Sequence, residues 1–212
     1  MIDYYETKSQ PVNRLMVWQA YAKVKANQGS AGIDYMDWAY LEEHRSAELY
    51  KLWNRLTSGS YFPQAVKRVA IPKKTGGERY LGIPTILDRI AQEVVHTYLE
   101  RKVEPLFHNS SFGYRPGRNC HQAVQQACSK SMNHDFAIDL DIKGFFDNID
   151  HELMMKAVKH YCTDKWVLYV CGKMAQSRYL SKRRDNYFTF AGNTAGRSNQ
   201  SVVSQYLSAC GI

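Results

Sequence analysis

Apolar residues recur at helical spacing in several stretches of the chain. Within residues 11–26, Leu15, Trp18 and Tyr21 are spaced three residues apart, which predicts a helix that ends at the turn formers of residues 27–32. A second helical region is expected over residues 36–57. Three more helices are expected, one opened by Pro84-Thr85 with an apolar side through Leu99, and two over residues 119–131 and 150–162.

Two short segments, 66–71 and 79–83, have strand character and flank the sequence KKTGGE. Paired glycines between two such segments are typical of a β-hairpin, so we predict one here. The segment 109–117 is expected to be a loop, because it contains Asn109, Gly113 and the Pro116-Gly117 turn.

The stretch AIDLDIKGFFDNID contains the most informative pattern. Ile138, Leu140 and Ile142 face one side of a predicted strand. Asp139 and Asp141 face the other side, and carboxylates held on a rigid strand suit a divalent metal such as magnesium. An edge strand with solvated aspartates is the alternative interpretation.

Composition sets broad limits on function. The chain has 212 residues, 44% of them hydrophobic, and a formal charge of +8, which favours a polyanionic partner. The five cysteines form no CxxC pair, which favours reduced thiols over a zinc site. No basic-then-apolar leader and no window approaching 18 apolar residues occur, so we expect a cytosolic, cytoplasmic protein with no membrane partner.

Basic residues occur beside two predicted turns. Lys73 and Arg79 flank the glycines of the hairpin, and Arg115 and Arg118 flank a Pro-Gly turn. Such positions suit contacts with phosphates, although a solvated surface turn is the more common explanation of each pair when it is taken alone.

The order of these motifs resembles the group II intron reverse transcriptases (RNA-directed DNA polymerases, also maturases). The similar segments are RVAIPKKTGGERYLGIPTILDRIAQEVV, SSFGYRPGRNCHQAV and AIDLDIKGFFDNIDHELMMKAV, preceded by NQGSAGID and GSYFPQAVKRV. The resemblance implies an α/β fold: right-hand polymerase fingers plus an incomplete palm after a helix-rich N-terminal extension. It implies an RNA-binding extension over residues 1–60, and fingers and early palm over residues 61–168.

The resemblance also implies roles for individual residues. Asp141 matches the first metal-binding aspartate, and the Ile142 carbonyl matches the neighbouring Mg²⁺ ligand. Phe146 matches the steric gate against a ribose 2′-hydroxyl, although core packing is its simpler explanation. Lys73 and Arg79 match residues that grip the incoming triphosphate, whereas Arg115 and Arg118 lie in the segment that resembles an RNA contact. Asp150 is interpreted as the cap of the following helix.

The chemistry that the resemblance implies is two-metal nucleotidyl transfer. A DNA primer 3′-hydroxyl attacks the α-phosphate of a deoxynucleoside triphosphate paired to an RNA template, and members also bind their intron RNA as maturases. A homodimer is left open.

The chain departs from this family in one decisive respect. The family carries an Asp-Asp pair within Tyr-Ala-Asp-Asp, and no Asp-Asp dipeptide occurs anywhere in the 212 residues. One carboxylate cannot hold two metal ions, so we expect a truncated chain that is inactive alone.

The segment from residue 169 onward has an unusual relation to the family. If the codons for YVCGKMAQ are read one nucleotide later, permitted codon choices give MYVERWLK. The same shift applied to GNTAGRSNQSVVSQYLSA permits GTPQGGVISPLLANIFLH. Both shifted translations resemble sequences of the family. We therefore interpret residues 169–212 as an out-of-frame tail, with the resemblance ending at Leu168 and the tail poorly packed. More than half of the +8 charge lies in this tail, which weakens the charge argument for nucleic acid.

Three further hypotheses stay open. The first is a non-catalytic module that binds intron RNA. The second is the product of a non-functional pseudogene, and the third is a reverse transcriptase of another bacterial retroelement. Salt-dependent RNA affinity without primer extension would favour the first of these, and cooperative unfolding would argue against the second.

Overall fold

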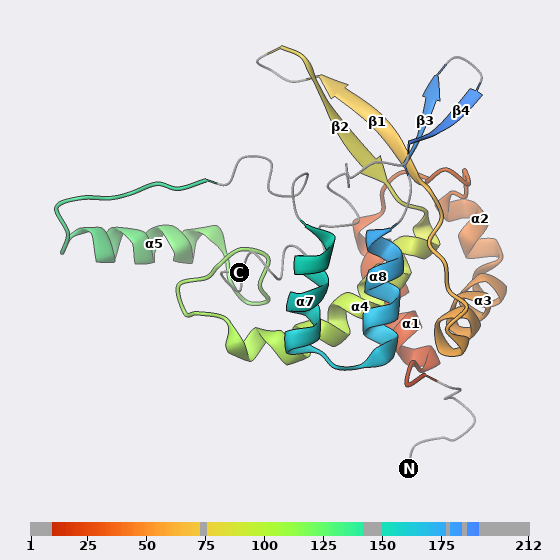
Figure 1. Ribbon diagram of the computed structural model, residues 1–212, viewed down its shortest axis with the longest axis horizontal. Helices are drawn as coiled ribbons and strands as arrows, with labels where there is room; N and C mark the ends of the chain where they lie inside the picture. Colours follow the sequence, from red (N-terminus) through yellow and green to blue (C-terminus); the bar gives the residue numbers. More distant parts are fainter. Residues whose placement is uncertain (1–9, 73–75, 142–149, 177–178, 184–185, 191–212) are drawn as a thin grey trace.

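The structure, a computed structural model, describes residues 10–72, 76–141, 150–176, 179–183 and 186–190. Figure 1 shows a helical body with a sheet at one end and a helix, α5, that extends to one side. The elements in chain order are α1 (Arg14–Asn27), α2 (Trp38–Glu43), α3 (Arg45–Ser58), β1 (Val66–Pro72), β2 (Glu78–Ile83), α4 (Ile86–Val103), the 3₁₀ turn η1 (Glu104–Leu106), α5 (Cys120–Ser131), α7 (His151–Tyr161), α8 (Lys165–Ala175), β3 (Tyr179–Arg183) and β4 (Asn186–Phe190).

The predicted helices form where their boundary residues satisfy free backbone N–H groups. Thr85 caps α4 by accepting from the Asp88 amide at 3.1 Å, and the Asp150 carboxylate accepts from Glu152 and Leu153, which confirms its predicted capping role. The single helical region expected over 36–57 is two helices, α2 and α3, which meet at His44.

The hairpin forms as predicted and continues into a mixed sheet. β1 and β2 are antiparallel, with Ile71 opposite Arg79, and the sheet order is β2-β1-β3-β4 with β1 and β3 parallel. Gly76 and Gly77 have φ of 87° and 80°, values that side chains disfavour, so the turn requires glycine.

One hydrophobic core joins α1, α3, α4, α7 and α8. The apolar side predicted for α4 is buried throughout, from Ile86 to Leu99, and it packs against α1. The Trp53 indole N–H of α3 donates to the Val12 carbonyl at 2.8 Å. Because this core includes both Val17 and Val94, the sequence boundary expected at 60/61 does not coincide with a break in packing.

The expectation of a poorly packed tail is wrong for residues 169–176. Val170, Cys171 and Met174 of α8 are buried in the core, against which Met154 and Val158 of α7 are also buried. The physical reason is the helical spacing of these apolar residues, which places them on one face of α8. Residues 179–183 and 186–190 form a hairpin beside β1.

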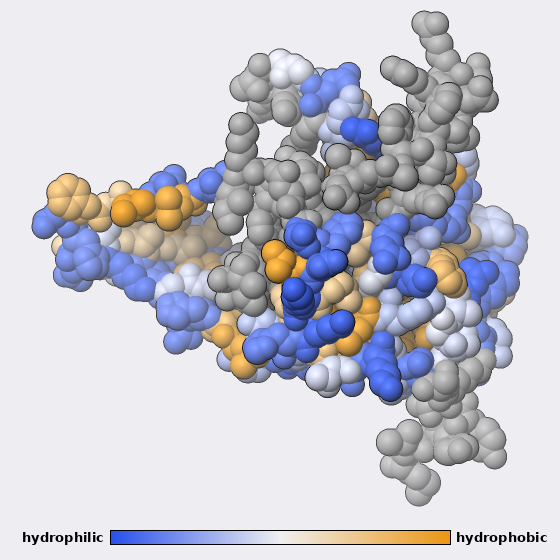
Figure 2. Space-filling view, in the orientation of Figure 1, coloured by the Kyte–Doolittle hydropathy of each residue, from blue (hydrophilic) through white to orange (hydrophobic). Residues whose placement is uncertain are grey.

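The predicted carboxylate strand is also wrong within the described residues. Residues 136–141 have no strand partner, and Phe136, Ile138 and Leu140 are 90%, 85% and 88% exposed. A strand needs a neighbour for its backbone hydrogen bonds and apolar face, and no described segment supplies one. α5 likewise buries no residue, and Figure 2 shows apolar side chains exposed on this projecting part.

None of the described helices is both long and apolar enough to cross a membrane.

Candidate nucleic-acid interface

Arg115 is bound inward within the loop before α5. Its Nε and Nη2 donate to the Glu104 carboxylate at 3.0 and 2.8 Å, and Nη1 donates to the His108 and Ser111 carbonyls, both at 2.9 Å. The remaining Nη2 contact is with the Glu104 carbonyl at 3.5 Å, and the guanidinium lies over the Phe107 ring. The side chain is only 6% exposed. Since every N–H of the guanidinium has an internal acceptor, Arg115 has no donor left for RNA in this conformation.

Arg118 is the more available cation of the predicted pair. In the described part of the chain its guanidinium donates one hydrogen bond, to the Asn109 carbonyl at 3.3 Å, and lies over the Phe112 ring. The Lys130 ammonium reaches the same loop from α5, where it donates to the Ser110 hydroxyl at 2.7 Å. The loop therefore presents two cations that retain donors for phosphate oxygens.

The hairpin places the predicted triphosphate residues only in part. The backbone of Arg79 lies in β2, but its side chain and all of Lys73 fall outside the described residues. On the described surface, the Arg68 guanidinium stacks 3.7 Å from the centre of the exposed Tyr80 ring.

A buried carboxylate that sequence reasoning missed fixes the chain where it enters the hairpin. Asp88 accepts from the Tyr61 hydroxyl at 2.7 Å and from the Gln64 amide at 3.0 Å. Burial raises the pKa of Asp88, and the hydrogen bonds from Tyr61 and Thr85 oppose that rise. An acidic residue between the buried Ile86 and Ile90 was the available signal.

The predicted metal site is not assembled in the described residues. Asp141 is exposed, whereas Ile142 and Phe146 fall outside the described part of the chain. Within that part, no group of three or more histidine, cysteine or acidic side chains could hold a metal ion. One exposed carboxylate does not fit the donor set of a two-metal site.

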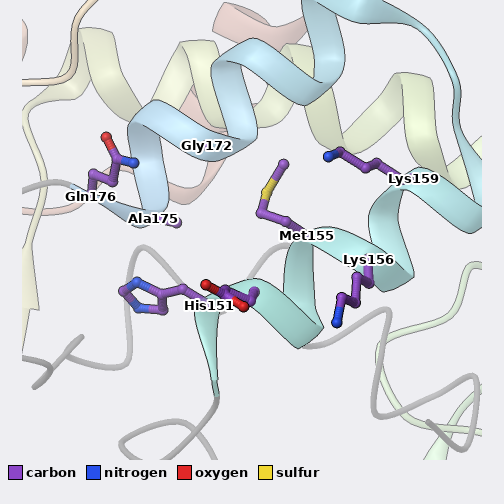
Figure 3. A pocket seen from close by; sticks show the side chains of 8 residues that line it. His151, Met155, Lys156, Lys159, Gly172, Ala175 and Gln176 are labelled. Atoms are coloured by element: carbon purple, nitrogen blue, oxygen red, sulfur yellow. The ribbon is translucent and has the colours of Figure 1, made fainter.

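A separate groove of about 360 Å³ lies between α7 and α8. Figure 3 shows Met155 directed towards α8, with His151 at one end and Lys159 on the opposite side. None of the residues predicted from the sequence to bind metal, nucleotide or RNA lines this groove, so it gives no support to those assignments.

Comparisons with known proteins agree with the motif order. Residues 71–206 match the family described as reverse transcriptase (RNA-dependent DNA polymerase). The group II intron-encoded protein LtrA of Lactococcus lactis subsp. cremoris is 32% identical over 84% of this chain and 29% of its own length. The protein YkfC of Escherichia coli K12 is 35% identical over 70% of this chain and 40% of its own length.

The extent of these matches shows how far the resemblance continues along this chain and how much of each relative the chain covers. Because the family match continues to residue 206, the expectation that the resemblance ends at Leu168 is wrong. The chain spans less than half of the length of LtrA and of YkfC. Because this family model covers more than half of the chain, the chain belongs to the reverse transcriptase (RNA-dependent DNA polymerase) family.

Proposed function

We propose that this chain forms the N-terminal extension, fingers and early palm of a group II intron reverse transcriptase, and that alone it binds RNA without extending a primer. The observation that carries the proposal is the family match over residues 71–206 in a sequence with no Asp-Asp dipeptide. The relative LtrA, which is named as a group II intron-encoded protein, supports the group II assignment.

The proposed division of roles follows the motifs. Lys73 and Arg79 contact the triphosphate of a deoxynucleotide, and Phe146 excludes a ribose. Arg118 contacts RNA, whereas the donor count of Arg115 favours a positioning role. Residues 1–60 contribute further RNA contacts, and a homodimer remains a prediction.

Reverse transcriptases generally use Mg²⁺, and here Asp141 and the Ile142 carbonyl are the proposed first ligands. The sequence has no Asp-Asp pair to add to these two ligands, so the metal-binding set is incomplete. Polymerisation therefore requires further protein carboxylates, and the DNA primer and deoxynucleoside triphosphates are partners of the whole enzyme only.

The test measures binding and extension on the same preparation. We expect affinity for a structured RNA to fall as salt rises, with a log–log slope of about −0.7 to −0.9 per phosphate contact. We expect no extension of a DNA primer on an RNA template, under conditions in which a commercial reverse transcriptase extends it. Extension by this chain would contradict the proposed inactivity, and absence of RNA binding would contradict the RNA-binding role.

A pseudogene product without a stable fold is the second hypothesis, since the sequence has no Asp-Asp dipeptide to complete the catalytic acids. A cooperative unfolding transition argues against it, because such a transition requires a packed native state.

A further inference from the structure

Tyr114 has a strained backbone and an exposed ring that makes no polar or ring contact with the described residues. Its φ is 54°, a left-handed value that bulky side chains rarely adopt, and it is 71% exposed. Among the described residues, its side chain makes no hydrogen bond, ion pair or ring contact. The contacts of this side chain therefore do not explain why a tyrosine occupies a position that suits glycine or asparagine.

The loop around Tyr114 is held by its neighbour. Arg115 bonds to the carbonyls of His108 and Ser111 and to the Glu104 carboxylate, so the turn cannot relax without breaking those bonds. Strain that surrounding structure maintains, at a largely exposed side chain, is typical of functional positions.

Tyr35 provides an internal comparison. It is also exposed and has a φ of 56°, but the Lys67 ammonium lies 5.4 Å from the centre of its ring. No cation of the described residues lies over the Tyr114 ring, and the side chain is largely exposed, so the ring is available to a planar ligand.

The surroundings of Tyr114 favour a nucleic acid as that ligand. Arg118 and Lys130 lie on or reach the same loop with N–H donors to spare, whereas the charge of Arg115 is neutralised by Glu104. Aromatic rings combined with cations are the usual means of binding single-stranded nucleic acids, because every base offers a π face and every nucleotide a phosphate.

We propose that Tyr114 stacks on an unpaired base of bound RNA, that Arg118 and Lys130 pair with adjacent phosphates, and that Arg115 is a positioning residue. This inference rests on the proposed RNA-binding function and assigns the contact to a residue that the motifs did not single out.

The test compares two variants of the full chain with a fluorescent, unstructured single-stranded RNA. Tyr114→Phe keeps the ring, and we expect affinity within about twofold of the unmodified protein. Tyr114→Asn removes the ring and suits a positive φ, and we expect affinity to fall roughly 5- to 150-fold, the range measured for loss of one stacked base.

Thermal melting separates a binding role from a structural one. Asparagine tolerates the left-handed region, so Tyr114→Asn should leave the melting temperature unchanged or raise it by about 2 °C. A structural tyrosine would give the opposite result, a lower melting temperature. The matched control is Tyr169→Ala on α8, since Tyr169 is exposed but already has the Lys173 ammonium 5.4 Å from the centre of its ring, and the affinity of this variant should stay within about twofold.

The salt dependence distinguishes stacking from charge. Arg118→Ala should make the log–log slope less steep by about 0.7, whereas Tyr114→Asn should leave the slope unchanged. Unchanged affinity of Tyr114→Asn, with RNA binding by the unmodified protein intact, would overturn this inference alone. No binding by the unmodified protein would overturn the proposed function and this inference with it.

Discussion

Glu93 on α4 links two helices of the core through its carboxylate. Lys23 of α1 lies 3.0 Å from it, and His96 lies 3.6 Å away on the next turn of α4. Burial acts to raise the pKa of Glu93, but the hydrogen bonds from His96 and Lys23 outweigh it and lower the pKa to about 2. The ionised form is thus the one that stabilises the folded protein.

The pH dependence of stability follows from the direction of that shift. The unfolded carboxyl titrates near the ordinary value of 4.5, so this contribution is complete above pH 4.5 and is lost as the pH falls towards 2. After allowance for screening at the half-exposed Lys23, we expect Glu93→Gln to lower the free energy of unfolding by about 1–2 kcal/mol at pH 7. Urea denaturation at pH 7 and pH 2.5 measures this, and the difference from the unmodified protein should shrink at the lower pH.

The control for this prediction is Glu48→Gln. Glu48 pairs with Lys51 three residues away on the same helix, and pairs of this kind contribute little, so the loss should stay within about 0.5 kcal/mol. A pH-independent deficit in Glu93→Gln would contradict the electrostatic explanation.

Gly32 allows the loop after α1 to lie directly on the start of α4. A Cβ added there would lie 2.6 Å from the Thr85 Cα and 2.8 Å from its amide nitrogen, both backbone atoms that cannot move aside cheaply. Arg89 holds the same loop through the carbonyls of Gln28 and Ser30. We expect Gly32→Ala to cost about 1–3 kcal/mol in a denaturant titration.

Gly113→Ala tests whether space is the cause. No atom lies within 4 Å of the added Cβ at that position, so its stability should change by less than about 0.5 kcal/mol. Equal losses in the two variants would show that the backbone freedom of glycine, and not the contact with Thr85, decides the result.

At the scale of elements, α8 contains a glycine that the fold does not use. The Cβ of an alanine at position 172 would meet only the Met155 methyl at 3.9 Å, an ordinary contact. Because glycine is a poor helix former, Gly172→Ala should raise the free energy of unfolding by about 0.5–1 kcal/mol. The same substitution at Gly59, where φ is 72° at the end of α3, should lower it by a similar amount. Denaturation midpoints with unchanged slopes measure both, and a loss in Gly172→Ala would mean that α8 is not helical there.

Most of the helices and strands could be predicted from the sequence, but one predicted strand does not form within the described residues. The predictions for α1, α4, α5, α7 and the β1–β2 hairpin are confirmed, because caps, turn glycines and apolar spacing act locally. The stretch AIDLDI has an equally clear period of two, yet it stays exposed, because a strand depends on a neighbour that local pattern cannot supply.

Side-chain roles at the candidate site were less predictable than the elements. The sequence alone places Arg115 in a basic loop, whereas the folded structure shows that its donors are directed inward, to Glu104 and two backbone carbonyls. The same holds for Tyr114, whose backbone strain has no counterpart in composition or spacing.

At the scale of the whole molecule, the same core draws on residues on both sides of Leu168. The buried face of α8 comprises Trp166 and Val167 before this point, and Val170, Cys171 and Met174 after it. The permitted shifted translation of residues 169–176, MYVERWLK, places Tyr, Val and Trp at these last three positions, and Glu and Arg at the less buried positions 172 and 173. Both translations therefore give an amphipathic helix with the same buried face, so packing of α8 does not choose between them.

The nucleotide sequence of the gene decides the question directly. The family match through residue 206 favours the frame as translated, whereas the codon relation at residues 192–209 favours a one-nucleotide slip. If the slip is real, the frame one nucleotide later must encode MYVERWLK and then GTPQGGVISPLLANIFLH, and must continue into Tyr-Ala-Asp-Asp. Repair of that nucleotide should then give primer extension that the present chain lacks, because the added aspartates complete the metal-binding set. If the shifted frame encodes neither motif, the slip is excluded, and the 169–206 segment is a divergent part of the family domain in its own frame.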